Sequence, residues 1–287
     1  MKYENVIAAE GGSKFNIKEL LKCKDLIILF VKRDFVVKYK QTILGPLWAV
    51  IQPLMTTIVF NLIFGKLAKL TISDSLSNTG QFMIPGFLFY MIGTIYWSYF
   101  SQTVTGISYS FVNNQKMLGK VYFPRIVIPI SEALSGLIPF GIRFVMFIGV
   151  YVYFFVGGEY DIKINRLIFL LPVLLIQLVL MGIAFGLIIA SVTIKYRDML
   201  HLMNFGMQLW HYVTPVAYGL ALIPQKYFGV YMLNPVTMVI LISRYAFFGT
   251  GYFSIGYYLL SWGVTLIMLI LGLLLFKKVE RTFMDTI

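Results

Sequence analysis

Charged residues are scarce in this sequence, and apolar residues are abundant. Only 13% of its 287 residues are Asp, Glu, Lys or Arg, whereas 59% are hydrophobic and the mean hydropathy is +0.82. A soluble domain is nearer roughly one quarter charged and one half apolar. Such an excess is too large for a surface that faces water, but an apolar exterior carries no penalty in lipid. The composition therefore excludes an ordinary soluble domain and indicates an integral membrane protein.

Cysteine and histidine are almost absent. The single cysteine, Cys23, permits no disulfide framework and no Cys/His metal cluster. The two histidines, His201 and His211, lie ten residues apart, a spacing that does not place them as ligands on one helix face. We therefore predict no metal site. A secretory signal peptide is not expected, because the first forty residues hold nine Lys or Arg and no short apolar core with a cleavage site.

A nucleotide-binding loop is also lacking. A P-loop needs two glycines separated by four residues, followed by Lys and Ser or Thr, so that backbone amides surround the phosphates. Gly65-Lys66 and Gly119-Lys120 lack both the earlier glycine and the hydroxyl. We therefore expect no cofactor on this chain and no hydrolysis of ATP by it. A transporter of this composition must take its energy from another chain, or else act as a passive or ion-coupled carrier.

Charges within the apolar segments are equally rare, and Glu132 and Arg143 are the exceptions. They lie eleven residues apart on one predicted helix, which places them on one face but ~16 Å from each other. Because a charge at mid-bilayer costs about 2.5–3.5 kcal/mol on insertion scales, this scarcity argues against a proton-driven carrier. Glu132 is expected near the cytosolic end, facing Arg125 or the basic N-terminal helix. Arg143 is expected to contact a neighbouring helix or the pathway.

Six apolar segments are long enough to cross a bilayer, which takes about 20 helical residues. They are predicted near residues 44–65, 82–106, 126–156, 167–194, 204–222 and 257–276. Because a helix satisfies its own backbone in lipid, the predicted fold class is an all-α integral membrane protein, without a convincing internal repeat. The chain then divides into a cytoplasmic N-terminus, the six-span membrane domain and a basic cytoplasmic tail, at 1–43, 44–276 and 277–287.

The 24 Lys and Arg residues, which give the chain a net charge of +12, are unevenly distributed. If the N-terminus is cytoplasmic, the connections on that side hold 17 of them and the outer connections hold 6. Basic residues gather on the cytoplasmic side of membrane proteins, so both termini are predicted to lie in the cytosol. A basic protein can also bind nucleic acid, but the bias between alternating connections favours the membrane explanation.

Residues 15–40 are predicted to form an amphipathic helix that lies in the plane of the lipid headgroups. Asn16, with Glu19 three residues later, forms a plausible helix cap. Basic and apolar residues alternate at helical spacing, and the apolar run Leu26–Val31 is too short to span. The alternative is a solvated helix of a soluble N-terminus, which the immediately following span disfavours.

Three connections carry further local signals. At the end of the N-terminal helix, Gly45 relaxes the backbone and Pro46 suits the first turn of a new helix, so a sharp change of direction is expected. The polar loop 107–125 is predicted to contain a short helix near Ser110–Leu118, either as a docking knob for a soluble partner or as a plain connector. The proline-interrupted segment 223–256 is too hydrophobic for an aqueous loop and is predicted to form short re-entrant or outer-leaflet helices.

Several short motifs occur in order over nearly the whole chain. They are Lys38-Tyr39-Lys40-Gln41-Thr42, Leu44-Gly45, Trp48-Ala49, Phe123-Pro124-Arg125, Tyr196-Arg197-Asp198, Thr214-Pro215-Val216-Ala217-Tyr218, Asn234-Pro235 and the basic ending at 276–283. Together, at these separations and with six spans, they resemble the permease subunits of polysaccharide-export ABC transporters.

The resemblance implies a homodimeric permease of the bacterial cytoplasmic membrane that exports a lipid-linked polymer: the O-antigen of lipopolysaccharide, capsule or teichoic acid. It implies an A2B2 complex in which two copies of a separate ATPase carry ATP and Mg²⁺, and no nucleic-acid partner. The first cytoplasmic loop would be the coupling helix, and the Leu-Gly turn would admit the lipid headgroup. The implied headgroup or interface residues are Lys32, Arg33, Lys38, Lys40, Leu44 and Gly45. The implied ATPase-coupling residues are Ser110, Asn113, Asn114, Gln115 and Lys116.

Aromatic residues make up 17% of the chain. Interfacial belts and ordinary packing account for many of them, but aromatic faces also suit the apolar faces of sugar rings. Rings that line a pore would let a polymer slide without fixed hydrogen bonds. The candidate pathway residues are Trp48, Tyr90, Tyr96, Trp97, Trp210 and Tyr218.

Gly182 and Gly186 form a Gly-x-x-x-Gly pair that lets helices approach closely, and we expect internal packing rather than a dimer contact.

Two other classes of protein remain open. A related ABC permease for drugs or small lipids would lack a continuous aromatic pore. An integral membrane enzyme acting on polyprenyl lipids would need a cluster of Asp, Glu or His at a cytosolic face. The cytosolic loops offer Asp198 and His201 and little else, so no catalytic residue is predicted.

Overall fold

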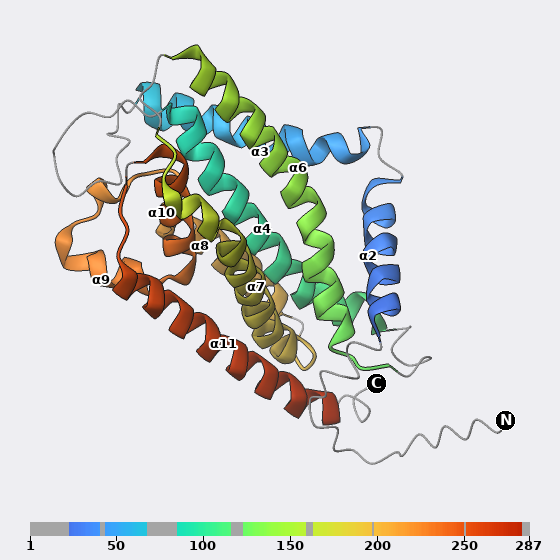
Figure 1. Cartoon of the computed structure of the whole chain (residues 1–287). Helices are drawn as coiled ribbons and strands as arrows, with labels where there is room; N and C mark the ends of the chain where they lie inside the picture. The colour runs from blue at the N-terminus through green and yellow to red at the C-terminus, as the bar shows by residue number, and fades with distance from the viewer. Residues whose placement is uncertain are drawn as a thin grey trace.

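The structure is a computed structural model that describes residues 23–40, 44–67, 85–115, 123–158, 163–196, 198–249 and 251–282 (Figure 1). Over these residues the regular secondary structure is entirely helical, which confirms the predicted all-α class. Helix is the expected outcome for an apolar chain, because lipid offers no hydrogen-bond partners to an open backbone.

The described residues form long helices joined by shorter helical segments. In chain order they are α2 (Lys24–Tyr39), η1 (Gly45–Leu47), α3 (Trp48–Phe60), η2 (Asn61–Leu67), α4 (Gly86–Asn113), α6 (Val127–Gly157), η3 (Arg166–Leu170), α7 (Leu171–Thr193), α8 (Met199–Val213), η4 (Leu220–Leu222), α9 (Gln225–Leu233), α10 (Pro235–Phe248) and α11 (Ile255–Thr282).

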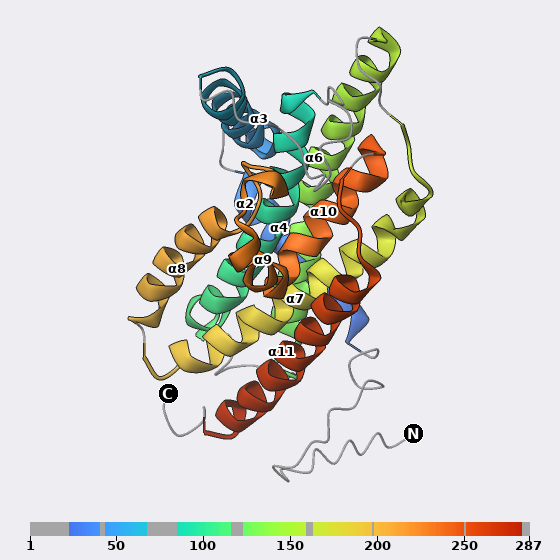
Figure 2. The ribbon, with the colours of Figure 1, turned by 90° about the vertical axis from the view of Figure 1, so that its left-hand side faces the viewer.

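Helix α4 lies at the centre of the bundle. It contacts α3, α6, α7, α8 and α10, while α11 packs on the far side of α7 and α2 packs against α6. Figure 2 shows α8 beside α4 and α7, on the opposite side from α11. Because α4 is surrounded, 18 of its 28 residues are buried, among them hydroxyl residues whose side chains bond to their own helix backbone. The hydroxyl groups of Thr94 and Ser108 are therefore satisfied without water.

One end of the bundle brings together helix ends that are far apart in sequence. Phe30 of α2, Phe111 near the end of α4, Val127 at the start of α6 and Phe276 of α11 share one buried apolar cluster. The rings of Phe111 and Phe276 lie 5.2 Å apart. The start of α2 and the later turns of α11 therefore lie at the same end of the molecule. That this end is cytoplasmic remains a prediction from the charge distribution.

Four helical stretches among the described residues are long and apolar enough to cross a membrane, and a fifth is obtained if one bent pair is counted. They are Gly45–Phe64, Val127–Gly157, Arg166–Thr193 and Ile255–Val279, which match four of the predicted spans. Helix α4 is not among these four, because it is less apolar. Its 28 residues are nevertheless ~42 Å long, which exceeds the ~30 Å hydrocarbon core. The number of six spans remains a prediction.

The predicted span 204–222 is wrong in its extent. Helix α8 begins earlier, at Met199, and ends at Val213, after 15 residues. Its length of ~22 Å is less than the hydrocarbon thickness. Pro215 follows directly, and a proline disfavours helical backbone in the residue before it, so Thr214 is extended with ψ 136°.

The expected short helix near Ser110–Leu118 is also corrected in part. Ser110 and Asn113 belong to the last turns of α4, which continues seven residues beyond the predicted span end at 106. Asn114 ends the helix with its amide bonded to the carbonyl of Ser110. Residues 116–122, which include the rest of the expected helix, lie outside the described residues.

The segment 223–256 contains two short helices, α9 and α10, which meet at an angle of 100° across Asn234. The Asn234 side chain accepts from the backbone N–H of Val236, and Pro235 occupies the first turn, so this residue pair both ends one helix and caps the next. Helix α10 is almost completely buried. The geometry fits either a broken span or the predicted re-entrant element.

The Gly-x-x-x-Gly pair on α7 packs inside the protomer, as expected. A Cβ atom on Gly182 would lie 2.6 Å from Cγ2 of Thr103, and one on Gly186 would lie 2.7 Å from Cβ of Ile107. Both contacts are with α4, so the absence of side chains allows α7 to approach α4 closely.

We predict that Gly186→Ala lowers the thermal unfolding temperature of the detergent-solubilised protein, because overpacking at the α4–α7 contact costs about 1–3 kcal/mol. Gly149→Ala on α6 is the matched control, since a Cβ there meets nothing within 4 Å. In a helix interior it should be neutral or stabilising by up to about 1 kcal/mol. Equal unfolding temperatures for the two variants would contradict the packing role of Gly186.

Candidate functional site

Helix α2 presents both basic and apolar side chains to its surroundings. Lys32, Lys38 and Lys40 are exposed and Arg33 is half-buried, whereas Phe30 is buried against the bundle. Apolar side chains are exposed beside them: Ile28, Leu29, Val36 and Val37. This mixture suits a helix at the boundary between headgroups and hydrocarbon. The proposed cap at Asn16 and Glu19 lies outside the described residues.

The turn after α2 has the backbone that the sequence predicted. Gly45 has φ +47°, a left-handed conformation that glycine adopts without steric cost, and Pro46 stands in the first turn of η1. Helix α3 then leaves in a different direction from α2 (Figure 1). Leu44 is 38% exposed and Trp48 is 50% exposed, so the Leu-Gly turn and the indole after it are accessible in the protomer.

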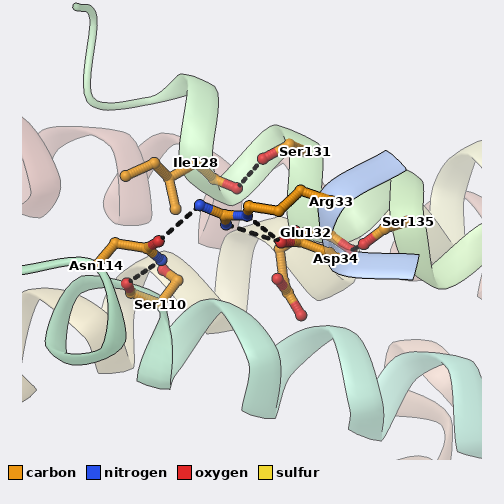
Figure 3. A network of polar contacts seen from close by, with 8 residues as sticks. All are labelled: Arg33, Asp34, Ser110, Asn114, Ile128, Ser131, Glu132 and Ser135. Carbon is orange, nitrogen blue, oxygen red and sulfur yellow. Dashed lines mark hydrogen bonds and ion pairs between the residues drawn. The ribbon is translucent and has the colours of Figure 1, made fainter. Parts of the chain in front are cut away.

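A polar network joins α2 to the end of α4 (Figure 3). Arg33 Nη1 donates to Oδ1 of Asn114 at 3.1 Å, and Asn114 Nδ2 donates to the carbonyl of Ser110 at 2.7 Å. The same guanidinium pairs with Asp34 Oδ1 at 2.7 Å and lies 4.8 Å from the centre of the Phe30 ring. A residue expected to meet the headgroup is thus bonded directly to a residue expected to serve ATPase coupling.

The expected coupling residues occupy one short stretch. Ser110 is buried, with its hydroxyl bonded to the carbonyl of Ile107, whereas Asn113 is exposed and Asn114 and Gln115 are half-buried. Lys116 lies outside the described residues. Asn114 is the member of this set whose side chain bonds to another element.

A pocket of about 460 Å³ lies between α2, α4 and α6. Its walls carry charged, amide and hydroxyl side chains, two aromatic rings and two glycines. The lining residues are Asp34, Phe35, Val37, Lys38, Tyr39, Ser101, Gln102, Thr103, Thr105, Gly106, Glu132, Ser135, Gly136 and Pro139. Its volume falls in the range of small-ligand sites, roughly 300–1,000 Å³.

Glu132 points into this pocket from α6, toward α4 and α2 (Figure 3). The Glu132 carboxyl group fits against α4 because residue 106 is glycine, and a Cβ atom on Gly106 would collide with this carboxyl group. Glu132 faces the basic N-terminal helix, as expected. Partial burial lowers the pKa of Lys38, with Arg143 acting in the same direction and Glu132 opposing both.

Arg143 anchors α3 to the bundle, which confirms its expected contact with a neighbouring helix. Its Nε donates to the carbonyl of Ala49 at 3.1 Å, and Nη2 donates to Oε1 of Gln102 at 3.3 Å. Pro53, four residues after Ala49, has no N–H, so the helix cannot satisfy that carbonyl itself. Arginine replaces the missing donor.

The predicted pathway aromatics fall into two groups. Tyr90, Tyr96 and Trp97 are at most 4% exposed, and Trp97 packs against half-buried Trp210 with ring centres 6.3 Å apart. Tyr218 is half-buried and Trp48 is exposed. In the protomer, therefore, the rings of α4 form core packing, and their role in a pathway stays a prediction.

Helices α3 and α8 present a mixed outer face that the sequence analysis did not single out. They flank α4 and meet where Phe60 and His211 lie 6.0 Å apart. On α8, polar residues are exposed beside aromatic and aliphatic ones: His201, Leu202, Phe205, Gln208, Leu209 and Tyr212. Exposed His and Gln are unsuited to lipid, so this face fits a partner or a water-filled pathway better than hydrocarbon.

The two proline motifs of the second half contact each other around a buried arginine that sequence reasoning missed. Asn234 Nδ2 donates to Oγ1 of Thr214 at 2.9 Å. Arg244 of α10 is fully buried; its Nη2 donates to the carbonyls of Val216 at 2.9 Å and Phe89 at 3.3 Å, and its guanidinium lies 3.5 Å from the Phe89 ring centre. An arginine within an apolar run was the available signal.

The histidines do not come together. His201 is exposed on α8, while His211 lies 5.2 Å from Trp97 in the aromatic core. Across the described ranges, no group of three or more His, Cys, Asp or Glu is placed to hold a metal ion.

Comparison with known proteins places these features in a family. A family model described as "ABC-2 type transporter" matches residues 25–248. An O-antigen export system permease protein RfbA of Klebsiella pneumoniae is 28% identical over 273 residues, covering 95% of this chain and 97% of the relative. A protein of the same name from Myxococcus xanthus is 26% identical over 230 residues, covering 80% of this chain and 82% of the relative.

We predict that Arg244→Lys destabilises the protein, because lysine cannot both lie flat on Phe89 and reach two carbonyls. Leaving a buried carbonyl without its donor costs about 1–3 kcal/mol, which thermal unfolding in detergent would register as a lower midpoint. Arg166→Lys, at an exposed arginine, is the matched control and should leave the midpoint unchanged. An unaltered midpoint in Arg244→Lys would show that the buried guanidinium is dispensable.

Proposed function

The chain belongs to the ABC-2 type transporter family, and from this premise we propose that it is the membrane-spanning subunit of an exporter of lipid-linked polysaccharide. The observation that carries the proposal is the match to O-antigen export permeases over nearly the whole length of both chains. The chain is thus a transporter subunit and not an enzyme. Export of a drug or a small lipid is the alternative that the experiment below distinguishes.

Headgroup recognition is assigned to α2 and the turn after it. Exposed Lys32, Lys38 and Lys40 provide positive charge, which favours an anionic pyrophosphate as well as anionic lipid. The accessible Leu44-Gly45 turn lies directly after them and starts the change of direction into α3. A headgroup drawn to α2 would therefore arrive beside the first residues of α3.

The translocation pathway is assigned to the outer face of α3 and α8, completed by the same face of a second copy. Exposed Trp48 on α3 and Phe205 and Tyr212 on α8 offer ring faces, and exposed Gln208 and His201 tolerate water. Tyr90 and Tyr96, also predicted for the pathway, are buried in the protomer, so this proposal relies on the exposed rings. Apolar rings without fixed hydrogen bonds suit a polymer that must slide.

Coupling to a partner ATPase is assigned to the end of α4 and the loop that follows. Asn113 is exposed there, and Asn114 bonds to Arg33 of α2. Movement of the loop by the ATPase would thus reach the headgroup helix through one hydrogen bond. In this proposal two copies of the chain and two ATPase subunits form the complex, ATP and Mg²⁺ are held by the ATPase, and both termini lie in the cytoplasm.

We predict that deletion of the gene in its host removes the surface polysaccharide and accumulates the lipid-linked polymer inside the cell, and that the intact gene restores export. Surface polysaccharide is measured by immunoblot and the intracellular polymer by extraction of lipid-linked glycans. Normal surface polysaccharide in the deletion strain would refute the proposed substrate class and favour the alternative.

We predict that Asn114→Ala slows export, because loss of the bond to Arg33 weakens the link between α4 and α2. A hydrogen bond contributes about 0.5–1.5 kcal/mol, so the rate of polymer appearance at the surface should fall about two- to tenfold. Gln225→Ala, which removes an exposed amide on α9 outside the proposed coupling residues, is the matched control and should leave the export rate unchanged. The ATPase should still co-purify with Asn114→Ala, and export by this variant at the rate of Gln225→Ala would contradict a coupling role for the bond between Asn114 and Arg33.

A further inference from the structure

We propose that the pocket between α2, α4 and α6 binds the headgroup of an aminophospholipid, with its primary ammonium group at Glu132 and its phosphate at Lys38. The proposal does not depend on the exported polymer. It concerns a lipid of the surrounding membrane, held between α2 and the two helices α4 and α6.

The first argument is the charge of Glu132. A cation stabilises a carboxylate at the edge of a membrane bundle, because burial of the charge without one is costly. Among the described residues no Lys or Arg nitrogen lies within ion-pair distance of it. Arg33 is paired with Asp34, and Arg143 is bonded to Ala49 and Gln102. A cation from outside the chain would complete the site.

The second argument is a pair of hydroxyl oxygens that can accept. The Thr103 side chain is 2% exposed and lines the same pocket, and its Oγ1, which lies beside the Tyr99 hydroxyl, retains the capacity to accept a hydrogen bond. Ser135 contributes a second hydroxyl oxygen, which donates to the carbonyl of Glu132 and retains its capacity to accept. A primary ammonium has three N–H donors, and one carboxylate with two hydroxyl oxygens matches them.

The third argument is the arrangement of charges along the pocket. Since Asp34 and Arg33 neutralise each other, the remaining charges that line it are Glu132 on α6 and Lys38 on α2. One negative and one positive group complement a zwitterion that carries an ammonium and a phosphate. The volume of about 460 Å³ accommodates such a headgroup.

A membrane lipid is favoured over a soluble zwitterion by the rim of the pocket. Val37 lines the pocket and is 73% exposed, and Ile28, Leu29 and Val36 extend an exposed apolar surface along α2. Acyl chains attached to the phosphate would cover this surface, which water would otherwise wet.

The test is lipid binding to the full-length chain in detergent, measured by native mass spectrometry. The probes are dioleoyl-phosphatidylethanolamine, its N-methyl and N,N-dimethyl derivatives, and dioleoyl-phosphatidylcholine. Each methyl group removes one N–H donor, so affinity should fall along the series, with phosphatidylcholine weaker by about tenfold or more. Equal affinity along the series would overturn the proposal, and this measurement requires no variant.

Variants locate the site. Glu132→Gln should abolish the preference for phosphatidylethanolamine over phosphatidylcholine, whereas Asp25→Asn, the same change at an exposed position on α2, should retain it. Lys38→Met should weaken both lipids and keep the ratio between them, because the phosphate is common to both. Should Glu132→Gln fail to fold, the methylation series combined with Lys38→Met still decides the question.

Two results would overturn the assignment. A preference for phosphatidylethanolamine that survives in folded Glu132→Gln would place the ammonium group elsewhere. Soluble O-phosphoethanolamine that displaces the lipid at comparable concentration would show that acyl chains contribute nothing, and would assign the pocket to a soluble ligand.

Discussion

The requirement that backbone carbonyls inside the bundle find donors within the protein governs this structure. Two arginines supply such donors, one within a helix that contains a proline and one just after the end of a helix. Arg143 supplies the carbonyl of Ala49 with the donor that Pro53 lacks, and Arg244 supplies the carbonyl of Val216 in the irregular segment after α8. Each arginine thereby gives a buried carbonyl a donor from another helix.

This dependence explains which parts of the fold the sequence could predict. Long apolar segments such as 126–156 and 257–276 match α6 and α11 closely, because their length and composition need no tertiary contact. The extent of α8 was missed because apolar composition continues past Pro215, whereas the helix ends at Val213. The end of α4 was missed because its polar last turns resemble a loop when taken alone. Their packing against α7 and α11 is a property of the assembled bundle.

The candidate site divides in the same way. The change of direction at Gly45 follows from local chemistry, because glycine permits the left-handed backbone found there and proline suits the first turn of the next helix. The hydrogen bond between Arg33 and Asn114 joins residues 81 positions apart, so no local sequence pattern predicts it. Arg244 was counted among the charges of an outer connection, although it lies at the centre of two proline motifs. Buried aromatic rings such as Tyr96 could not be distinguished from accessible ones such as Trp48 by composition.

Helix α2 is connected to the end of α4, to the pocket and to the start of α3, so a movement of α2 would affect all three. Arg33 of α2 is bonded to the end of α4, Lys38 faces the pocket opposite Glu132, and the turn at Gly45 leads into α3. A displacement of the loop after α4 would therefore alter the pocket and the start of α3 together. A lipid held in that pocket would oppose the displacement, so the surrounding membrane would set the ease with which the subunit changes state.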